Sequence, residues 1–281
     1  MPRRFHQVDV FGSDRFRGNP LAVVVDSDGL DTERMQEIAR WTNLSETTFL
    51  VEPSAEGADY LVRIFTLTGE LPFAGHPTLG TAWVWKTVSG TPRDRPVVQE
   101  CGAGLVNVRP DGDGLAFAAP PVIRSGPVDD SDVERVATVL GLERSAIRAA
   151  EWVDNGPGWM ALMLEDAESV LAVEGDVARD PGSGSLEIGL VGFHPPGSET
   201  AYEIRALFSD ASGGLREDPV TGSLNASVAQ WLLSSGRVTA PYVATQGSAL
   251  GRDGRIRISE ADGQVWVGGS VHPVIEGTIS I

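Results

Sequence analysis

The sequence predicts an α+β protein made of two similar lobes, each of which wraps strands around one buried helix. Short runs of β-branched and aromatic residues outnumber the helical patterns along the 281-residue chain. Two helical patterns, one before Gly90 and one before Gly236, are apolar on nearly every side, which is typical of helices without a solvent-exposed face. Aligning these two glycines also aligns Trp85 with Trp231 at the same offset. The sequence therefore indicates that one helical unit is used twice.

The elements of the first lobe follow from strand, turn and helix signals. Asp31 is a candidate N-cap for a helix that starts at about Thr32. Pro77 suits the first turn of the first apolar helix, which should run to about Ser89 and end at Gly90. Strands are expected at residues 5–11, 21–25, 46–51 and 60–65, and over much of 97–117.

The second lobe repeats this plan. Ser131 and Glu134 form a capping box that is expected to open a helix to about Leu140. A strand at 202–208 should lead into a turn at 213–214, after which the second apolar helix follows.

The expected lobe boundaries follow from this duplication. We expect the first lobe to span residues 1–119 and the second to span 120–269, with a last strand at 270–281 that could return to the first lobe. The small and polar residues at 180–185 are expected to form a surface loop of the second lobe.

The composition excludes several classes of protein. The formal net charge is −17, and the 22 basic residues are scattered among 39 acidic ones, whereas phosphate contacts to nucleic acid need clustered Lys and Arg. No signal-peptide core follows Arg3 and Arg4, and no apolar run is long enough to span a bilayer, so we expect a cytoplasmic protein without membrane contacts. Cys101 is the only cysteine, which rules out an intrachain disulfide and a cysteine-rich zinc site.

Glycines and polar side chains introduce both apolar helices. Gly75 and His76 precede the first, and Asp218 with Thr221-Gly222-Ser223 precedes the second. A helix N-terminus presents unpaired N–H groups and about half a positive charge, so it attracts a carboxylate or a phosphate. The same residues also fit ordinary turn and cap chemistry, and His76 taken alone fits a structural histidine better than a catalytic one. The recurrence of the arrangement at the second helix favours a functional interpretation.

Common nucleotide, hydrolase and metal motifs do not fit the sequence. The stretch from Gly75 to Thr81 imitates a phosphate loop but lacks its lysine. There is no G-x-S-x-G elbow, and no two of the four histidines have metal-ligand spacing. These motifs therefore indicate neither a nucleotide nor a metal, although a metal held by residues distant in the sequence stays open.

Glu46 is the remaining candidate for chemistry. It begins a predicted strand, and an exposed carboxylate at a strand end is the simpler interpretation from sequence. A glutamate buried near a cleft would instead have a raised pKa and could take up and return a proton. Both interpretations stay open at this stage.

A set of motifs together resembles the phenazine-biosynthesis isomerase (PhzF-like) family. They occur in the family's order and are Asp9-Val10-Phe11, Gly18-Asn19-Pro20-Leu21-Ala22-Val23, Leu44-Ser45-Glu46-Thr47, Ala74-Gly75-His76-Pro77-Thr78 and Glu217-Asp218-Pro219-Val220-Thr221-Gly222-Ser223, with a weaker echo at Gln246-Gly247 and Gly251-Arg252. The resemblance implies the diaminopimelate-epimerase-like fold, with two pseudo-symmetric lobes that each wrap a curved, mostly antiparallel sheet around a central helix, and an active site between the lobes. It also implies a homodimer that uses neither cofactor nor metal.

The family's founding reaction isomerises a dihydro-hydroxyanthranilate by moving a proton between carbons. By this resemblance Glu46 is expected to carry the proton, while His76 and Asp218 orient the amino and hydroxyl groups of a small carboxylate substrate. The N–H groups of Gly222 and Ser223 are expected to hold the substrate carboxylate. Gly75 and Asn19 are further candidate substrate-binding residues.

The sequence also departs from related families and leaves alternatives open. Related racemases use two opposed cysteines, which Cys101 alone cannot supply. Leu224-Asn225-Ala226 stands where many family members have Ala-His-Cys, so the substrate stays unidentified. By this resemblance our first expectation is a cofactor-independent isomerase of secondary metabolism that acts on a small unsaturated or cyclic amino or hydroxy acid. The alternatives are a racemase, epimerase or dehydratase that uses Glu, Asp or His, and a non-catalytic binder of small carboxylates.

Overall fold

The computed structural model describes residues 2–174, 185–209 and 214–281 of the chain. Its contacts divide the chain into unit 1, Met1–Ala118 with Val267–Ile281, and unit 2, Ala119–Trp266. The loop predicted at 180–185 and the turn predicted at 213–214 fall outside the described residues, except for Ser185 and Gly214. Within the described ranges, no helix is long and apolar enough to cross a membrane.

Unit 1 is a mixed sheet with a helix on each face. The strands pair in the order β18–β1–β2–β3–β4–β6–β7–β8, and β5 adds to β4; the β2–β3 and β4–β6 pairs are parallel and the others antiparallel. The bounds are β1 Pro2–Val10, β2 Asn19–Val24, β3 Glu46–Val51, β4 Tyr60–Phe65, β5 Glu70–Leu71, β6 Val97–Cys101, β7 Gly104–Asp111, β8 Gly114–Ala118, β18 Val271–Ser280, α1 Thr32–Thr42 and α2 Gly75–Ser89.

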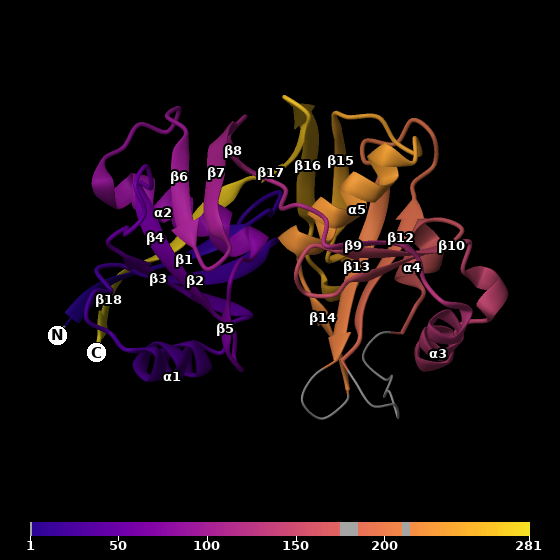
Figure 1. Cartoon of the computed structure of the whole chain (residues 1–281), viewed down its shortest axis with the longest axis horizontal. Helices are drawn as coiled ribbons and strands as arrows, with labels where there is room; N and C mark the ends of the chain where they lie inside the picture. The colour runs from indigo at the N-terminus through magenta and orange to yellow at the C-terminus, as the bar shows by residue number, and fades with distance from the viewer. Residues whose placement is uncertain (1, 175–184, 210–213) are drawn as a thin grey trace. The chain divides into compact units, whose positions relative to one another are not determined.

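Side-chain alternation assigns each helix to one face of this sheet. Phe49 on β3 packs with Met35 and Ile38 of α1. The neighbouring Thr48 points the other way, where its Oγ1 lies 2.8 Å from Oγ1 of Thr81 on α2. α2 contacts β1, β2, β3, β4, β6, β7, β8 and β18, so it is the central helix of unit 1 (Figure 1).

The predicted ends of these helices are confirmed. The Asp31 side chain accepts a hydrogen bond from the Arg34 N–H at 2.8 Å, which satisfies one of the unpaired donors of the first turn of α1. α2 ends at Gly90, whose φ of 71° is a left-handed conformation that glycine adopts without strain.

Unit 2 has the same kind of sheet. Its strands pair in the order β9–β10–β11–β12–β13–β15–β16, and β14 adds to β13; β11–β12 and β13–β15 are parallel. The bounds are β9 Arg124–Pro127, β10 Ala149–Asp154, β11 Met160–Met163, β12 Glu187–Phe193, β13 Tyr202–Ser209, β14 Leu215–Asp218, β15 Tyr242–Gln246, β16 Gly254–Ala261, α3 Asp130–Leu140, α4 Ala167–Leu171 and α5 Gly222–Ser234, with 3-10 turns at Arg144–Ala146 and Ser248–Leu250. β17, Gln264–Gly269, crosses from unit 2 into unit 1.

The connectivity of unit 1 is repeated in unit 2. In each unit a helix lies between two parallel strands, α1 between β2 and β3 and α4 between β11 and β12. Each unit then adds a short strand, β5 or β14, which leads into an apolar helix, α2 or α5. Both of these helices are largely buried, as their all-round apolar pattern predicts. The α+β class predicted from the duplicated helix is confirmed.

The predicted capping box at the start of α3 is wrong. The helix begins at Asp130, and its N-cap is Asp129, which makes no side-chain capping bond. Ser131 therefore lies inside the first turn with helical backbone. The residue that caps a helix must have extended backbone, and here the chain leaves that conformation two residues earlier than the S-x-x-E pattern implies.

Candidate active site

Glu46 is placed by the alternation of β3. It is two residues before Thr48, so its side chain lies on the α2 face of the sheet. Glu46 is 15% exposed, and its Oε2 lies 3.4 Å from Nε2 of His76. The carboxyl group is therefore partly enclosed beside the start of α2. The simpler interpretation of the sequence, an exposed carboxylate at a strand end, is wrong.

His76 is the second residue of α2 and is almost wholly enclosed, with 3% of its side chain exposed. Burial lowers its pKa to about 3 because the imidazolium form would lose its hydration. The ring is therefore neutral at physiological pH. A neutral imidazole at this position can orient groups by hydrogen bonding, but it does not serve as a proton reservoir.

Asn19 lies on the other side of the imidazole. Its Nδ2 is 3.4 Å from Nδ1 of His76, and its side chain is fully buried. When the amide N–H donates to Nδ1, the neutral ring carries its hydrogen on Nε2, the nitrogen that faces Glu46. Asn19, His76 and Glu46 thus form a row, and in that tautomer the imidazole directs an N–H toward the carboxyl group.

The Gly-Asn-Pro motif positions this asparagine at the start of β2. The Asp9 carboxylate accepts the N–H of Gly18 at 2.9 Å and that of Arg17 at 3.0 Å, which fixes the turn before the strand. A Cβ at Gly18 would overlap the main-chain oxygen of Val10, so only glycine fits there.

The starts of α2 and α5 both lack a side-chain cap. The N-cap of α2 is Ala74, which has no capping group, and Thr221 at the N-cap of α5 makes no side-chain capping bond. Gly75 and Gly222 are the first residues of these helices. Each first turn therefore retains the partial positive charge that attracts an anion.

In unit 2, Asp218 ends β14 just before α5. Its Oδ2 accepts a hydrogen bond of 2.6 Å from Oγ1 of Thr221. Gln246, at the end of β15, donates from Nε2 to the same hydroxyl at 3.0 Å. The carboxylate is thus fixed by a framework at the start of the helix.

Ser223 in the first turn of α5 is also fixed from outside the helix. Its Oγ accepts the indole N–H of Trp159 at 3.1 Å, and its main-chain oxygen accepts from Nδ2 of Asn155 at 2.9 Å. Because the hydroxyl oxygen is already an acceptor, its hydrogen is available to donate to a ligand. Gly222 and Ser223 together present N–H and O–H donors at the helix start.

The predicted site residues thus fall into two groups. Asn19, Glu46, Gly75 and His76 come together in unit 1, and Asp218, Gly222 and Ser223 come together in unit 2. Three supporting residues were not predicted from the sequence: Gln246, Trp159 and Asn155. Only Gln246 carried a signal, the weak family echo at Gln246-Gly247, whereas no sequence pattern marked the other two.

No metal centre accompanies these groups in the described part of the chain, where no three His, Cys, Asp or Glu side chains cluster with ligand geometry. Cys101 is a buried free thiol on β6. Burial raises its pKa, which disfavours the reactive thiolate.

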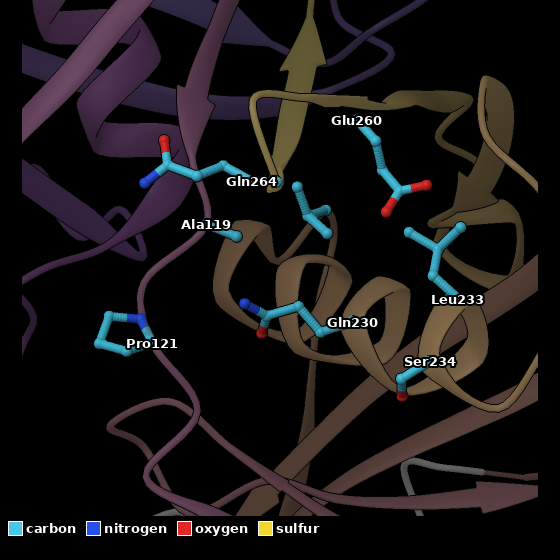
Figure 2. Close-up of a pocket in the computed structure, with 9 residues that line it drawn as sticks. Ala119, Pro121, Gln230, Leu233, Ser234, Glu260 and Gln264 are labelled. Carbon is cyan, nitrogen blue, oxygen red and sulfur yellow. The ribbon is translucent and has the colours of Figure 1, made fainter.

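A hollow of about 460 Å³ lies elsewhere in unit 2, beside the C-terminal half of α5 (Figure 2). It contains none of the predicted site residues. Its walls are mostly exposed side chains on β16, β17, α5 and the segment after β8: Ala119, Pro121, Gln230, Leu233, Ser234, Glu260, Gly263, Gln264 and Val265. The titratable group there, Glu260, is exposed to solvent. This hollow therefore lacks the enclosed acid–base groups that the starts of α2 and α5 present.

Known proteins match nearly the whole chain. The model of the phenazine biosynthesis-like protein family matches residues 8–277. A Schizosaccharomyces pombe protein named antisense-enhancing sequence 1 is 33% identical, over 97% of this chain and 97% of the relative. The trans-2,3-dihydro-3-hydroxyanthranilate isomerase of Pseudomonas fluorescens is 32% identical, over 92% of this chain and 90% of that enzyme.

A solved structure agrees with the fold. The structure of a predicted epimerase from Pseudomonas aeruginosa is similar with a TM-score of 0.79 and 26% identity, and covers 99% of each chain. These findings confirm the family resemblance, the fold class and the prediction of an isomerase.

Proposed function

The chain belongs to the phenazine biosynthesis-like protein family, and from this premise we propose that it is a cofactor-independent isomerase of a small carboxylic acid. It moves a proton between two carbons of an unsaturated or cyclic acid that also carries an amino or hydroxyl group. The Pseudomonas fluorescens relative is named for such a substrate, trans-2,3-dihydro-3-hydroxyanthranilate. That compound is the first to test.

The row of Glu46, His76 and Asn19 carries this proposal. His76 is neutral, because burial lowers its pKa to about 3, so it is unsuited to shuttle protons near neutral pH. The adjacent carboxyl group of Glu46 is the group that can accept and return one. Nε2 of the imidazole lies 3.4 Å from Oε2 of Glu46, which places its N–H to orient that carboxyl group or a substrate oxygen beside it.

The proposed proton transfer is balanced without any other reactant. The Glu46 carboxylate takes a proton from one substrate carbon, and the electron pair of the broken C–H bond spreads into the adjacent unsaturated system. The protonated Glu46, whose O–H hydrogen exchanges with water, then delivers a proton to a second carbon, where a new C–H bond forms. One carboxyl group can serve both carbons when the substrate is held still on one face.

We propose that residues at the start of α5 bind the substrate and keep it in place. The Ser223 hydroxyl and the N–H groups of Gly222 and Ser223 suit the substrate carboxylate, since they are donors at the positive end of a helix dipole. Asp218 is an acceptor and suits an ammonium or hydroxyl group. We propose Asp218, Gly222 and Ser223 as substrate-binding residues.

Deuterium incorporation tests this function. The protein is incubated in heavy water with a panel of cyclic and diene amino acids, and uptake of deuterium at carbon is followed by mass spectrometry. Glu46→Gln should abolish uptake, because an amide cannot carry the proton. Glu187→Gln is the matched control, since Glu187 begins β12 as Glu46 begins β3. Undiminished uptake by Glu46→Gln would remove Glu46 from the mechanism.

An epimerase is the second candidate, because the similar solved structure from Pseudomonas aeruginosa is named a predicted epimerase. Epimerisation would return the proton to the same carbon from the opposite face, with Asp218 as the second acid–base group. Inversion of a stereocentre, detected by chiral chromatography of the panel products, distinguishes this reaction from isomerisation. Tight binding without any isotope exchange would instead indicate a carboxylate-binding protein.

We further propose that the enzyme is a cytoplasmic homodimer that serves secondary metabolism, as the family resemblance implies. Light scattering of the purified protein would give the mass of the assembly. A mass of one chain, 29.8 kDa, would contradict the dimer.

A further inference from the structure

Gln246 makes every hydrogen bond that its amide group can make. It is fully buried at the end of β15. Its Oε1 accepts from the Thr221 main-chain N–H at 3.0 Å and from Asn225 Nδ2 at 2.7 Å. Its Nε2 donates to the main-chain oxygen of Asp218 at 3.1 Å and to Thr221 Oγ1 at 3.0 Å. The side chain thus joins β14, the N-cap of α5 and the first turn of that helix.

The orientation of this amide is dictated by backbone groups. A main-chain N–H can only donate and a main-chain oxygen can only accept, so Oε1 must face Thr221 N and Nε2 must face Asp218 O. Rotating the amide by half a turn would place two donors together at Thr221 N and at Asn225 Nδ2, and two acceptors together at Asp218 O. Nε2 is therefore always directed at the Thr221 hydroxyl.

The direction of the Thr221 hydroxyl follows from this. Its oxygen accepts from Gln246, so its single hydrogen is left for Asp218 Oδ2, 2.6 Å away. A short O–H···O bond to a carboxylate is among the stronger hydrogen bonds in proteins. One oxygen of Asp218 is thereby occupied, which fixes the rotation of the carboxylate and leaves Oδ1 as the oxygen not held by Thr221.

We propose that Gln246 is a positioning residue for the reaction, which holds Asp218 as an oriented hydrogen-bond acceptor through the Thr221 hydroxyl. Asn225 belongs to the same device, because its Nδ2 bonds both Gln246 Oε1 and the Thr221 main-chain oxygen at 3.0 Å. Its side chain is fully buried. Asn225, in the Leu224-Asn225-Ala226 departure from the common family pattern, is thus a partner for Gln246. The proposal rests on the proposed function in so far as Asp218 contacts the substrate.

Unit 1 offers a matched comparison. Gln99 on β6 is also fully buried and also bonds a threonine in the first turn of the apolar helix, with Nε2 donating to Thr78 Oγ1 at 2.9 Å. Its Oε1 accepts from the Tyr60 hydroxyl at 3.2 Å. The Thr78 hydroxyl donates to the Ala74 main-chain oxygen and not to a carboxylate. Gln99 therefore shares the burial and packing of Gln246 without a link to a site carboxylate.

The test compares Gln246→Met, Thr221→Val and their double variant with Gln99→Met, using the full-length protein and the substrate that shows turnover. Gln246→Met and Thr221→Val should each lower kcat about 10- to 100-fold, because a misplaced orienting group costs about this much. Thr221→Ser, which keeps the hydroxyl, should restore kcat. Gln99→Met should lose thermal stability as Gln246→Met does and keep kcat.

The double variant tests whether Gln246 acts through the Thr221 hydroxyl. If it does, Gln246→Met adds no further loss of kcat to Thr221→Val. Multiplicative losses, or an unchanged kcat in Gln246→Met, would overturn the proposal. A loss confined to KM would overturn it as well, since it would make the network a binding element only.

A crystal structure of Gln246→Met without substrate separates this proposal from the proposed function. The Asp218 carboxylate should rotate away from its position in the unchanged protein. If the carboxylate rotates in this variant but the unchanged protein turns over no substrate, positioning of Asp218 by Gln246 is supported and the isomerase function is refuted. An unmoved Asp218 in that variant, or in Thr221→Val should Gln246→Met fail to fold, would refute positioning whatever the activity.

Discussion

Lowering the pH from 8 to 5 should destabilise the protein through His76. Burial lowers the pKa of this histidine to about 3, from 6.5 for an exposed one. The unfolded chain therefore binds the proton more readily than the folded protein, so the stability is complete above pH 6.5 and declines as the pH falls below that value, until about pH 3. These two values give a loss of about 2 kcal/mol at pH 5, or about 4–8 °C in the unfolding midpoint.

Glu187 acts in the opposite direction and would mask this loss in the unchanged protein. Burial raises its pKa to about 7, above the ordinary 4.5. The stability it contributes is therefore complete below pH 4.5 and is lost as the pH rises through 7. Only a comparison of variants isolates the contribution of either group.

The assay is urea unfolding, followed by tryptophan fluorescence, of the unchanged protein, His76→Gln and Glu187→Gln at pH 8 and pH 5. Between these pH values His76→Gln should lose about 2 kcal/mol less stability than the unchanged protein, because glutamine does not titrate. Glu187→Gln should lose more than the unchanged protein. An equal pH dependence in the unchanged protein and His76→Gln would show that the buried ring takes up a proton freely, and it could then not be the neutral donor beside Glu46.

Two further predictions concern the framework of unit 2. Glu217→Gln should cost about 3–5 kcal/mol, because it leaves the Arg205 guanidinium buried without its carboxylate. Glu70→Gln makes the same change in the more exposed pair with Arg63 and should cost about 0–1 kcal/mol; equal losses in urea unfolding would contradict the effect of burial. Gly192→Ala should cost about 1–3 kcal/mol or more, since its Cβ would overlap the main-chain oxygen just before α4. An unchanged unfolding midpoint would show that this backbone moves readily.

The sequence determined the elements whose causes are local. β3 and β4 have the predicted bounds, because β-branched and aromatic runs favour strands. α1 has its predicted cap, since Asp31 needs only the N–H three residues later. The two apolar helices are buried because no face of either can be hydrated. The motifs around Glu46, His76 and Asp218 could likewise be identified from short stretches of sequence.

Only the tertiary structure decided how these stretches meet within each unit. His76 faces Asn19, which is 57 residues away in the chain. Gln246 accepts a hydrogen bond at the start of α5 from Thr221, which is 25 residues before it. The predicted capping box was wrong because the backbone becomes helical at Asp130, three residues after β9 ends, and the S-x-x-E pattern does not reveal this. Burial, which makes the His76 ring neutral, is a property of the packed unit and of no single segment. The sequence thus supplied the candidate residues for proton transfer, and folding determined the charge of the His76 ring and the side chains that face it.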